Sequence, residues 1–113
     1  MAKYESRLAG DFDKILDDIN TAVTTGSASA SLEESSNFIA DGGRCAVRVY
    51  ERYSWSGGNR VSLNVTLFEA SSQTFVTAIA SGGSQAMFFK VNTFGEESFL
   101  KTLVSVLERY SIK

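Results

Sequence analysis

The chain has 113 residues, of which 43% are hydrophobic and 21% are charged, and its formal net charge is −2. This composition is that of one globular domain with a single core, and it is too apolar for a disordered chain. The chain contains no histidine and one cysteine, Cys45, which excludes Ser-His-Asp triads, imidazole metal sites, intrachain disulfides and zinc sites built from several thiolates.

Residues 11–26 carry the first helical pattern. Apolar side chains recur there every three or four positions and form a single stripe: Phe12, Ile15, Leu16, Ile19 and Val23. Asp11 precedes the stripe, where its carboxylate can accept a hydrogen bond from a free amide of the first turn. Gly26 follows the stripe and is a natural helix stop. The spacing therefore predicts a helix between these two residues.

From Ser27 the apolar period changes to two, which is typical of strands. Runs rich in Gly, Ser and Asn separate the strand patterns and supply turns. The segment 74–80 is apolar in both alternating sets, which indicates a strand in the interior of a sheet. The predicted strands cover residues 27–33, 44–55, 61–68 and 74–80. The segment 85–91 has the pattern of a further short strand, and a loop is the alternative for it.

A second helical pattern closes the chain. Thr93 and Glu96 have the spacing of a capping box, in which each side chain bonds a free amide of the first turn. A buried stripe follows, formed by Phe99, Leu103, Val106, Leu107 and Tyr110.

This order predicts one α+β domain over residues 1–113 with the element order α-β-β-β-β-β-α. The predicted turns are short enough for an antiparallel meander, and each helix has one apolar stripe to bury. We therefore expect a two-layer sandwich in which both helices cover one face of the sheet. The other face stays uncovered.

Arginine is concentrated in the middle of the chain. Residues 1–41 hold 3 basic and 8 acidic side chains, whereas residues 42–68 hold four arginines against Glu51 alone. Cys45, Val47 and Val49 alternate with the arginines along the strand 44–55, and we assign these three apolar side chains to the helix-covered face. That assignment places the arginines on the uncovered face.

The uncovered face would then carry a set of candidate interaction residues: Arg44, Arg48, Tyr50, Arg52, Asn64 and Phe68. Guanidinium groups bind carboxylates or phosphates through paired hydrogen bonds, and planar groups stack on aromatic rings. Such a face could bind a second copy of the chain as a homodimer, or a small anionic ligand. A solvated or internally paired face fits the same pattern, because arginine stems cover apolar surface. Nucleic acid fits poorly, since the chain is acidic overall.

A weaker candidate is the loop that carries Trp55, Asn59 and Arg60. An aromatic ring, an amide and a guanidinium converge there beside a glycine-rich turn, and loops on rigid strands often carry function. The alternative is a tryptophan packed at the edge of the core.

The sequence predicts no catalytic, cofactor or metal site. Cys45 falls on the apolar face by the alternation above, where a thiol is an inert small hydrophobe. Adjacent carboxylates such as Asp17 and Asp18 do not face each other. The glycine-rich segment 81–85 lacks the lysine of a phosphate-binding loop. An enzyme is therefore not expected.

Residues 1–25 are rich in charged side chains and contain no apolar run of the roughly 7–15 residues that a secretion signal needs. No segment approaches the roughly 20 apolar residues that span a bilayer. We therefore expect a cytoplasmic protein with no membrane partner.

Four stretches of the chain resemble a family of small uncharacterised bacterial proteins, found mainly in Gram-positive anaerobes. They are residues 44–53 (RCAVRVYERY), 57–63 (GGNRVSL), 81–86 (SGGSQA) and 92–97 (NTFGEE). The resemblance covers nearly the whole chain and implies a stand-alone bacterial cytoplasmic protein. It implies no activity, because the family offers no assigned function or catalytic residues to transfer.

These observations together predict a non-enzymatic interaction domain that self-associates through the arginine and aromatic side chains of the uncovered face. The alternative function is the binding of a small anionic metabolite.

Overall fold

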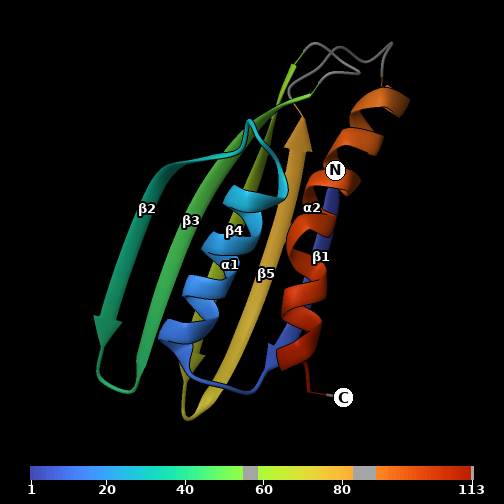
Figure 1. The fold of residues 1–113 in the computed structure, drawn as a ribbon. Coiled ribbons are helices and arrows are strands. Elements are labelled where there is room, and N and C mark those ends of the chain that lie inside the picture. Colours follow the sequence, from blue (N-terminus) through green and yellow to red (C-terminus); the bar gives the residue numbers. More distant parts are fainter. Residues whose placement is uncertain (55–58, 83–88, 113) are drawn as a thin grey trace.

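The protein is described by a computed structural model over residues 1–54, 59–82 and 89–112. These residues form a five-stranded sheet and two helices that lie on one face of it (Figure 1). In chain order the elements are β1 (Ala2–Leu8), α1 (Phe12–Gly26), β2 (Ser31–Ala40), β3 (Gly43–Ser54), β4 (Asn59–Ala70), β5 (Gln73–Gly82) and α2 (Phe89–Tyr110).

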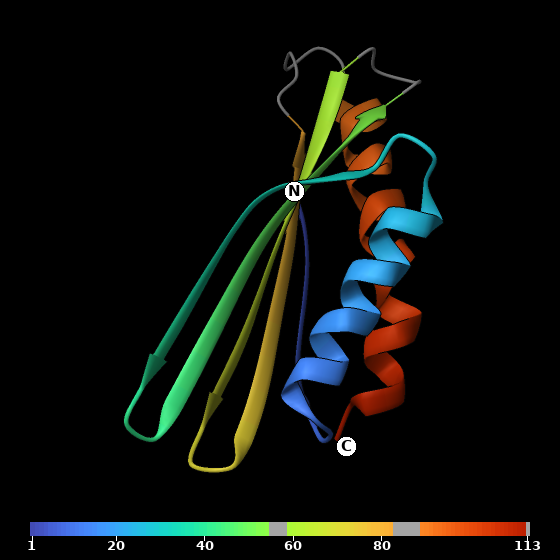
Figure 2. The same ribbon diagram turned by 60° about the vertical axis from the view of Figure 1, so that its left-hand side comes forward.

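The strands lie in the order β1-β5-β4-β3-β2, and all neighbouring pairs are antiparallel. From β2 to β5 the chain is a meander, and β1 joins the sheet beside β5. Helix α2 packs over β5, β1 and β4. Helix α1 lies beside α2, packs against β4 and contacts β3 through side chains (Figures 1 and 2). The predicted α+β class, a two-layer sandwich with both helices on one face, is confirmed.

Three segments differ from the sequence interpretation. The predicted strand 27–33 is shifted along the chain, because β2 covers Ser31–Ala40; its side chains are almost all exposed, so pairing with β3 and not an apolar period sets its limits. Ala2–Leu8 forms a strand, where no strand was predicted before the first helix. Its alternate residues Tyr4 and Leu8 face the helices, which leaves its charged residues on the other side. Helix α2 begins at Phe89, so the end of the predicted strand 85–91 is helical. The rest of that predicted strand lies outside the described residues.

Because α2 starts early, Thr93 lies inside the helix and Glu96 does not complete a capping box. Instead the Glu96 carboxylate accepts a hydrogen bond from the Gly82 amide (2.6 Å) and pairs with the N-terminal ammonium of Met1. Glu96 is only 5% exposed. It therefore connects α2 to the adjacent ends of β5 and β1.

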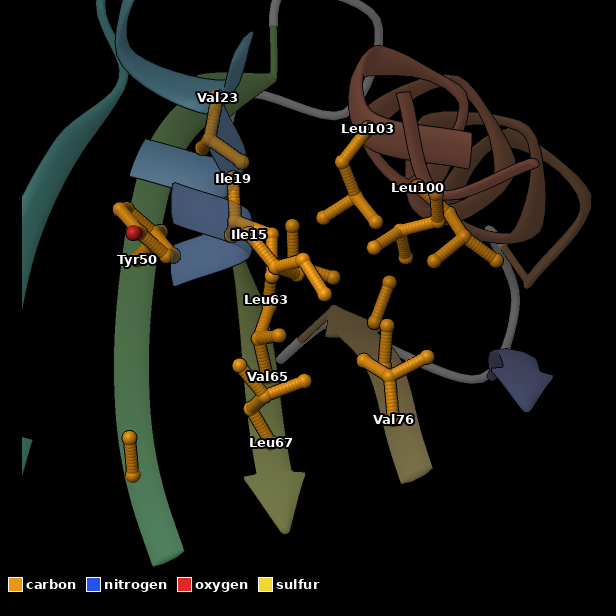
Figure 3. Packing of buried hydrophobic residues seen from close by; sticks show 14 of the residues in the cluster. Ile15, Ile19, Val23, Tyr50, Leu63, Val65, Leu67, Val76, Leu100 and Leu103 are labelled. Carbon is orange, nitrogen blue, oxygen red and sulfur yellow. The ribbon is translucent and has the colours of Figure 1, made fainter. Parts of the chain in front are cut away.

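Helix α1 forms as the sequence predicts. The Asp11 carboxylate accepts a hydrogen bond from the Lys14 amide (3.0 Å), which caps the first turn. The predicted stripe is buried against the sheet, with Leu16 at its partly buried edge. Figure 3 shows Ile15, Ile19 and Val23 on the side of α1 that faces Leu63 of β4.

The predicted orientation of β3 was wrong. Ala46 and Tyr50 are 1% and 0% exposed and belong to the core, so the even-numbered side chains of this strand face the helices. The cause is the register, because directly paired residues lie on one face of a sheet. Tyr50 pairs with Leu63 and Ala46 with Leu67, and both leucines are fully buried.

Candidate functional site

The sheet face that points away from the helices is the candidate functional surface, and we call it the open face (Figure 2). The register places side chains from all five strands on it in rows that run across the sheet from β2 to β1. We define three rows: Phe38–Cys45–Phe68–Phe75–Arg7, Ser36–Val47–Thr66–Thr77–Glu5 and Glu34–Val49–Asn64–Ile79–Lys3.

The first of these rows, the aromatic row, exposes three large rings: Phe68 and Phe75 on the neighbouring strands β4 and β5, and Phe38 on β2, beyond Cys45 of β3. Phe38 is 65% exposed, Phe68 44% and Phe75 40%. Single exposed apolar side chains are ordinary on a protein surface, but a contiguous group of them marks a contact or ligand surface. The aromatic row is therefore the most distinctive part of the open face.

Two shallow hollows flank Phe68 in this row. One, of about 320 Å³, lies between Phe68 and Phe38 and includes Cys45 in its wall. The other, of about 450 Å³, lies between Phe68 and Phe75 and extends towards Glu5. Phe68 thus forms a ridge with a depression on each side.

The charges of the open face lie towards its margins. Lys3 and Glu5 pair on β1, with 3.7 Å between nitrogen and oxygen. At the end of the sheet where β3 ends and β4 begins, Arg60 of β4 pairs with Glu51 of β3 (2.8 Å) and with Glu33 of β2 (3.7 Å). The side chains that the three rows place on β3, β4 and β5 are all uncharged. An uncharged centre inside a polar margin is the usual layout of a protein–protein interface.

The structure separates the six residues that the sequence analysis grouped on one surface. Asn64 and Phe68 lie on the open face, whereas Arg44, Arg48, Tyr50 and Arg52 lie on the face that carries the helices. The predicted arginine and aromatic surface therefore does not form.

Each of the three arginines has a local structural contact. The Arg44 guanidinium lies 4.0 Å from the centre of the Phe12 ring and pairs with Asp13 of α1 (2.8 Å). The Arg52 guanidinium lies 4.7 Å from the centre of the Phe99 ring of α2, and burial lowers the Arg52 pKa. Arg48 donates hydrogen bonds to the Ser36 carbonyl (3.2 Å) and to Asn37 Oδ1 (3.0 Å) of β2.

The weaker candidate loop is only partly visible. Trp55 lies outside the described residues, and Asn59 is the first residue of β4. Arg60 lies on the open face, where Glu51 and Glu33 pair with it. The convergence predicted for these three residues is therefore not described by the structure.

A cleft of about 580 Å³ opens on the helix side, at the end of the sheet that holds the β2–β3 and β4–β5 turns. Arg44 lines this cleft and is the natural place to look for the predicted anionic ligand. Its guanidinium is already paired with Asp13, and the Glu69 carboxylate lines the same cleft. An anion would have to displace one carboxylate and approach another.

The described residues include no group of three or more cysteine and carboxylate side chains placed to hold a metal ion. Neither helix, over the part that is described, is long and apolar enough to cross a bilayer.

Sequence reasoning missed Phe38, Phe75 and Ile79 as residues of this surface. The segment 74–80 did carry a signal, because both of its alternating sets are apolar. That pattern correctly predicted an interior strand, and β5 lies between β1 and β4. It also indicated that the face turned away from the helices is apolar enough to need a cover.

Residues 1–111 match the model of a family described as "Family of unknown function (DUF6054)". The chain belongs to this DUF6054 family. No curated protein and no solved structure matches it. The match extends over nearly the whole chain, as the sequence resemblance implied. Because DUF6054 membership carries no assigned activity, the role of this member has to be inferred from its own surfaces.

Proposed function

We propose that this chain is an interaction domain that associates with a second copy of itself through the open face. The observation that supports the proposal most directly is the aromatic row, in which the exposed ridge of Phe68 lies between two hollows. A two-fold contact brings the same patch of both copies together, and exposed aromatic rings on that patch can pack against each other in offset stacks.

The dimensions of the open face suit such a contact. Five strands spaced about 4.8 Å apart span about 24 Å, and the 10 residues of β5 extend over about 33 Å. The resulting area, about 800 Å² per copy, equals that of a standard protein–protein interface. Two sheets that pack face to face bury their side chains in the same way as the layers of a β-sandwich.

The centre of the open face has the chemistry that this packing needs. Val47 and Val49 of β3 are half-buried in the single chain, as is Ile79 of β5, so each retains apolar surface that a second sheet can cover. Burial of apolar surface contributes roughly 25 cal/mol per Å² before the costs of association are subtracted. The proposal is for binding and not for catalysis, in a chain that contains no histidine.

The test is the molar mass in solution, measured by size-exclusion chromatography with light scattering from about 1 μM to about 100 μM. We expect a dimer for the wild type and a monomer for Phe68→Asp. Thr66→Arg, which places a charge in the middle of the face, should have the same effect. Circular dichroism confirms that each variant remains folded.

Ile39→Asp is the matched control. Ile39 is 81% exposed and pairs with Arg44, so it lies on the helix side of β2. The substitution removes at least as much exposed apolar surface as Phe68→Asp does and adds the same charge, but it leaves the open face intact. Ile39→Asp should therefore remain a dimer. A wild type that is monomeric over the whole range, or an Ile39→Asp variant as monomeric as Phe68→Asp, would contradict the proposal.

We also propose, from the sequence resemblance and the expected compartment, a bacterial and cytoplasmic protein. The single thiol of Cys45 is compatible with a reducing compartment.

A further inference from the structure

The outer columns of the open face carry a charge pattern that can distinguish between dimer geometries. At one side, β1 contributes Lys3, Glu5 and Arg7 in consecutive rows. At the other side, β2 contributes Glu34 in the row of Lys3 and Phe38 in the row of Arg7. The middle column is β4. On one side of it, the β1 column carries two positive charges and one negative charge, and on the other side the β2 column carries the negative charge of Glu34.

A symmetric dimer of two aligned sheets has a two-fold axis in the plane between them, either across the strands or along them. An axis across the strands through the middle row would stack each β1 on the β1 of the second copy. Glu5 would then oppose the partner's Glu5, and Lys3 would oppose the partner's Arg7. Both contacts join like charges, which is unfavourable for directly opposed side chains.

An axis along the central strand gives the opposite result. Each row then meets the same row of the partner in reverse order, so β1 lies over the partner's β2. Lys3 faces the partner's Glu34, and Arg7 faces the partner's Phe38, where a guanidinium can stack on the ring. Phe68, Asn64 and Arg60 come to the axis, where each meets its own copy. Each Arg60 keeps its pairs with Glu51 and Glu33 of its own chain, which offset this like-charge contact.

We propose that the dimer has its two-fold axis parallel to β4, with Lys3 of each copy paired to the partner's Glu34. This inference rests on the proposed function, since it specifies how the two open faces meet. Lys3 and Glu5 have side chains that are 58% and 60% exposed in the single chain. Exposed ion pairs of this kind are weak, so Lys3 can exchange Glu5 for Glu34 at little cost.

The test is a charge-reversal cycle measured as the dimer dissociation constant by sedimentation equilibrium at low salt. Lys3→Glu and Glu34→Lys each create two like-charge contacts per dimer. We expect either change to raise the dissociation constant about tenfold. The double variant restores the pairs in the opposite sense and should return to within about threefold of the wild type.

Two substitutions on α2 control for the change in net charge. Lys101→Glu and Glu97→Lys alter the total charge by the same amounts at exposed positions of the helix layer, and they should leave the constant unchanged. Glu5→Gln separates the two axes. It should tighten the dimer if Glu5 opposes the partner's Glu5, and it should have little effect if Glu5 faces the partner's Ser36.

The failure of this inference differs from a failure of the proposed function. A wild type that is monomeric would contradict both self-association through the open face and the axis along β4. If Phe68→Asp dissociates the dimer, self-association through the open face stands. The axis along β4 is then contradicted if the double variant fails to restore the affinity, or if Glu5→Gln tightens the association.

Discussion

At the scale of single residues, Tyr50 shows how a polar atom is accommodated beneath the helices. Its ring is fully buried, and its hydroxyl donates a hydrogen bond to Asn20 Oδ1 of α1 at 3.0 Å. Burial raises the Tyr50 pKa from 10.0 to about 12, while the nearby Arg48 charge acts in the other direction. The long side chain thus fills the space between β3 and α1 and still satisfies its polar end.

The raised pKa predicts a loss of stability in alkaline solution. In the unfolded chain Tyr50 ionises around pH 10, whereas in the folded chain it stays neutral until about pH 12. The unfolded state therefore binds fewer protons between these values, and the free energy of unfolding falls there as pH rises, by up to about 1.4 kcal/mol per pH unit.

Tyr50→Phe tests this prediction through urea unfolding at a series of pH values. The variant should lose about 1 kcal/mol near neutral pH, because the hydrogen bond to Asn20 is gone. It should also decline less steeply than the wild type above about pH 10. Tyr53→Phe, at a side chain that is 48% exposed, is the control. If the free energy of unfolding falls equally with pH in Tyr50→Phe and in the wild type, ionisation of Tyr50 is not the cause of the alkaline loss of stability.

At the scale of elements, the β4–β5 hairpin is strained at its turn. Its two central residues, Ser71 and Ser72, both have positive φ angles, 53° and 65°. A two-residue turn of this kind favours Asn followed by Gly, because most other residues pay a steric cost in the left-handed region.

Replacing both residues, as Ser71→Asn with Ser72→Gly, should raise the free energy of unfolding by about 1 kcal/mol. Chemical denaturation gives the value. The β2–β3 turn provides the reverse comparison, since Gly42 has φ 80° and a Cβ there would meet no atom within 4 Å. Gly42→Ser should therefore destabilise through the backbone alone. A destabilised Asn-Gly variant would show that the serines make contacts worth more than the strain.

The elements with long, regular patterns could be predicted from the sequence. The apolar stripe of α1 repeats over the whole helix and fits only the helical period. The apolar residues of β4 alternate without interruption and fit only the period of a strand. The first turns of α2 were harder, because Phe89 and Val91 also fit an alternating strand. β1 was missed because its inward set includes Ala2 and Ser6, which give a weak apolar signal beside three charged residues.

The orientation of β3 depended on the parity of a single connection. Ser54 pairs with Asn59, so an even number of residues joins the two strands, and even-numbered positions of β3 lie beside odd-numbered positions of β4. The sequence interpretation paired even with even, which needs an odd number of connecting residues. A shift of one residue turns every side chain of a strand to the opposite face. Local apolarity could not settle the question, since β3 has valines on one face and Ala46 and Tyr50 on the other.

At the scale of the whole molecule, the sheet has two faces and the helices cover only one of them. If the open face is buried in a dimer, unfolding releases two chains and the melting temperature depends on protein concentration. For 113 residues we expect a rise of about 5 °C for a hundredfold increase in concentration.

Circular dichroism in cells of different path length measures this dependence. Phe68→Asp should show a melting temperature that is constant across the same range, and the control variant Ile39→Asp should follow the wild type. A wild-type melting temperature that does not change with concentration would be inconsistent with a dimer that forms through the folded chain.

Dimerisation through the open face changes the local dynamics of the edge strand β2. Nine of its ten residues are exposed in the single chain, because the strand lies at the margin of the sheet beyond the helix layer. Marginal strands with few buried contacts open locally more readily than interior ones. In the arrangement inferred above, β2 lies over β1 of the second copy and gains a cover on one side. The protein concentration then determines how often β2 opens locally, because β2 is fully protected only in the dimer.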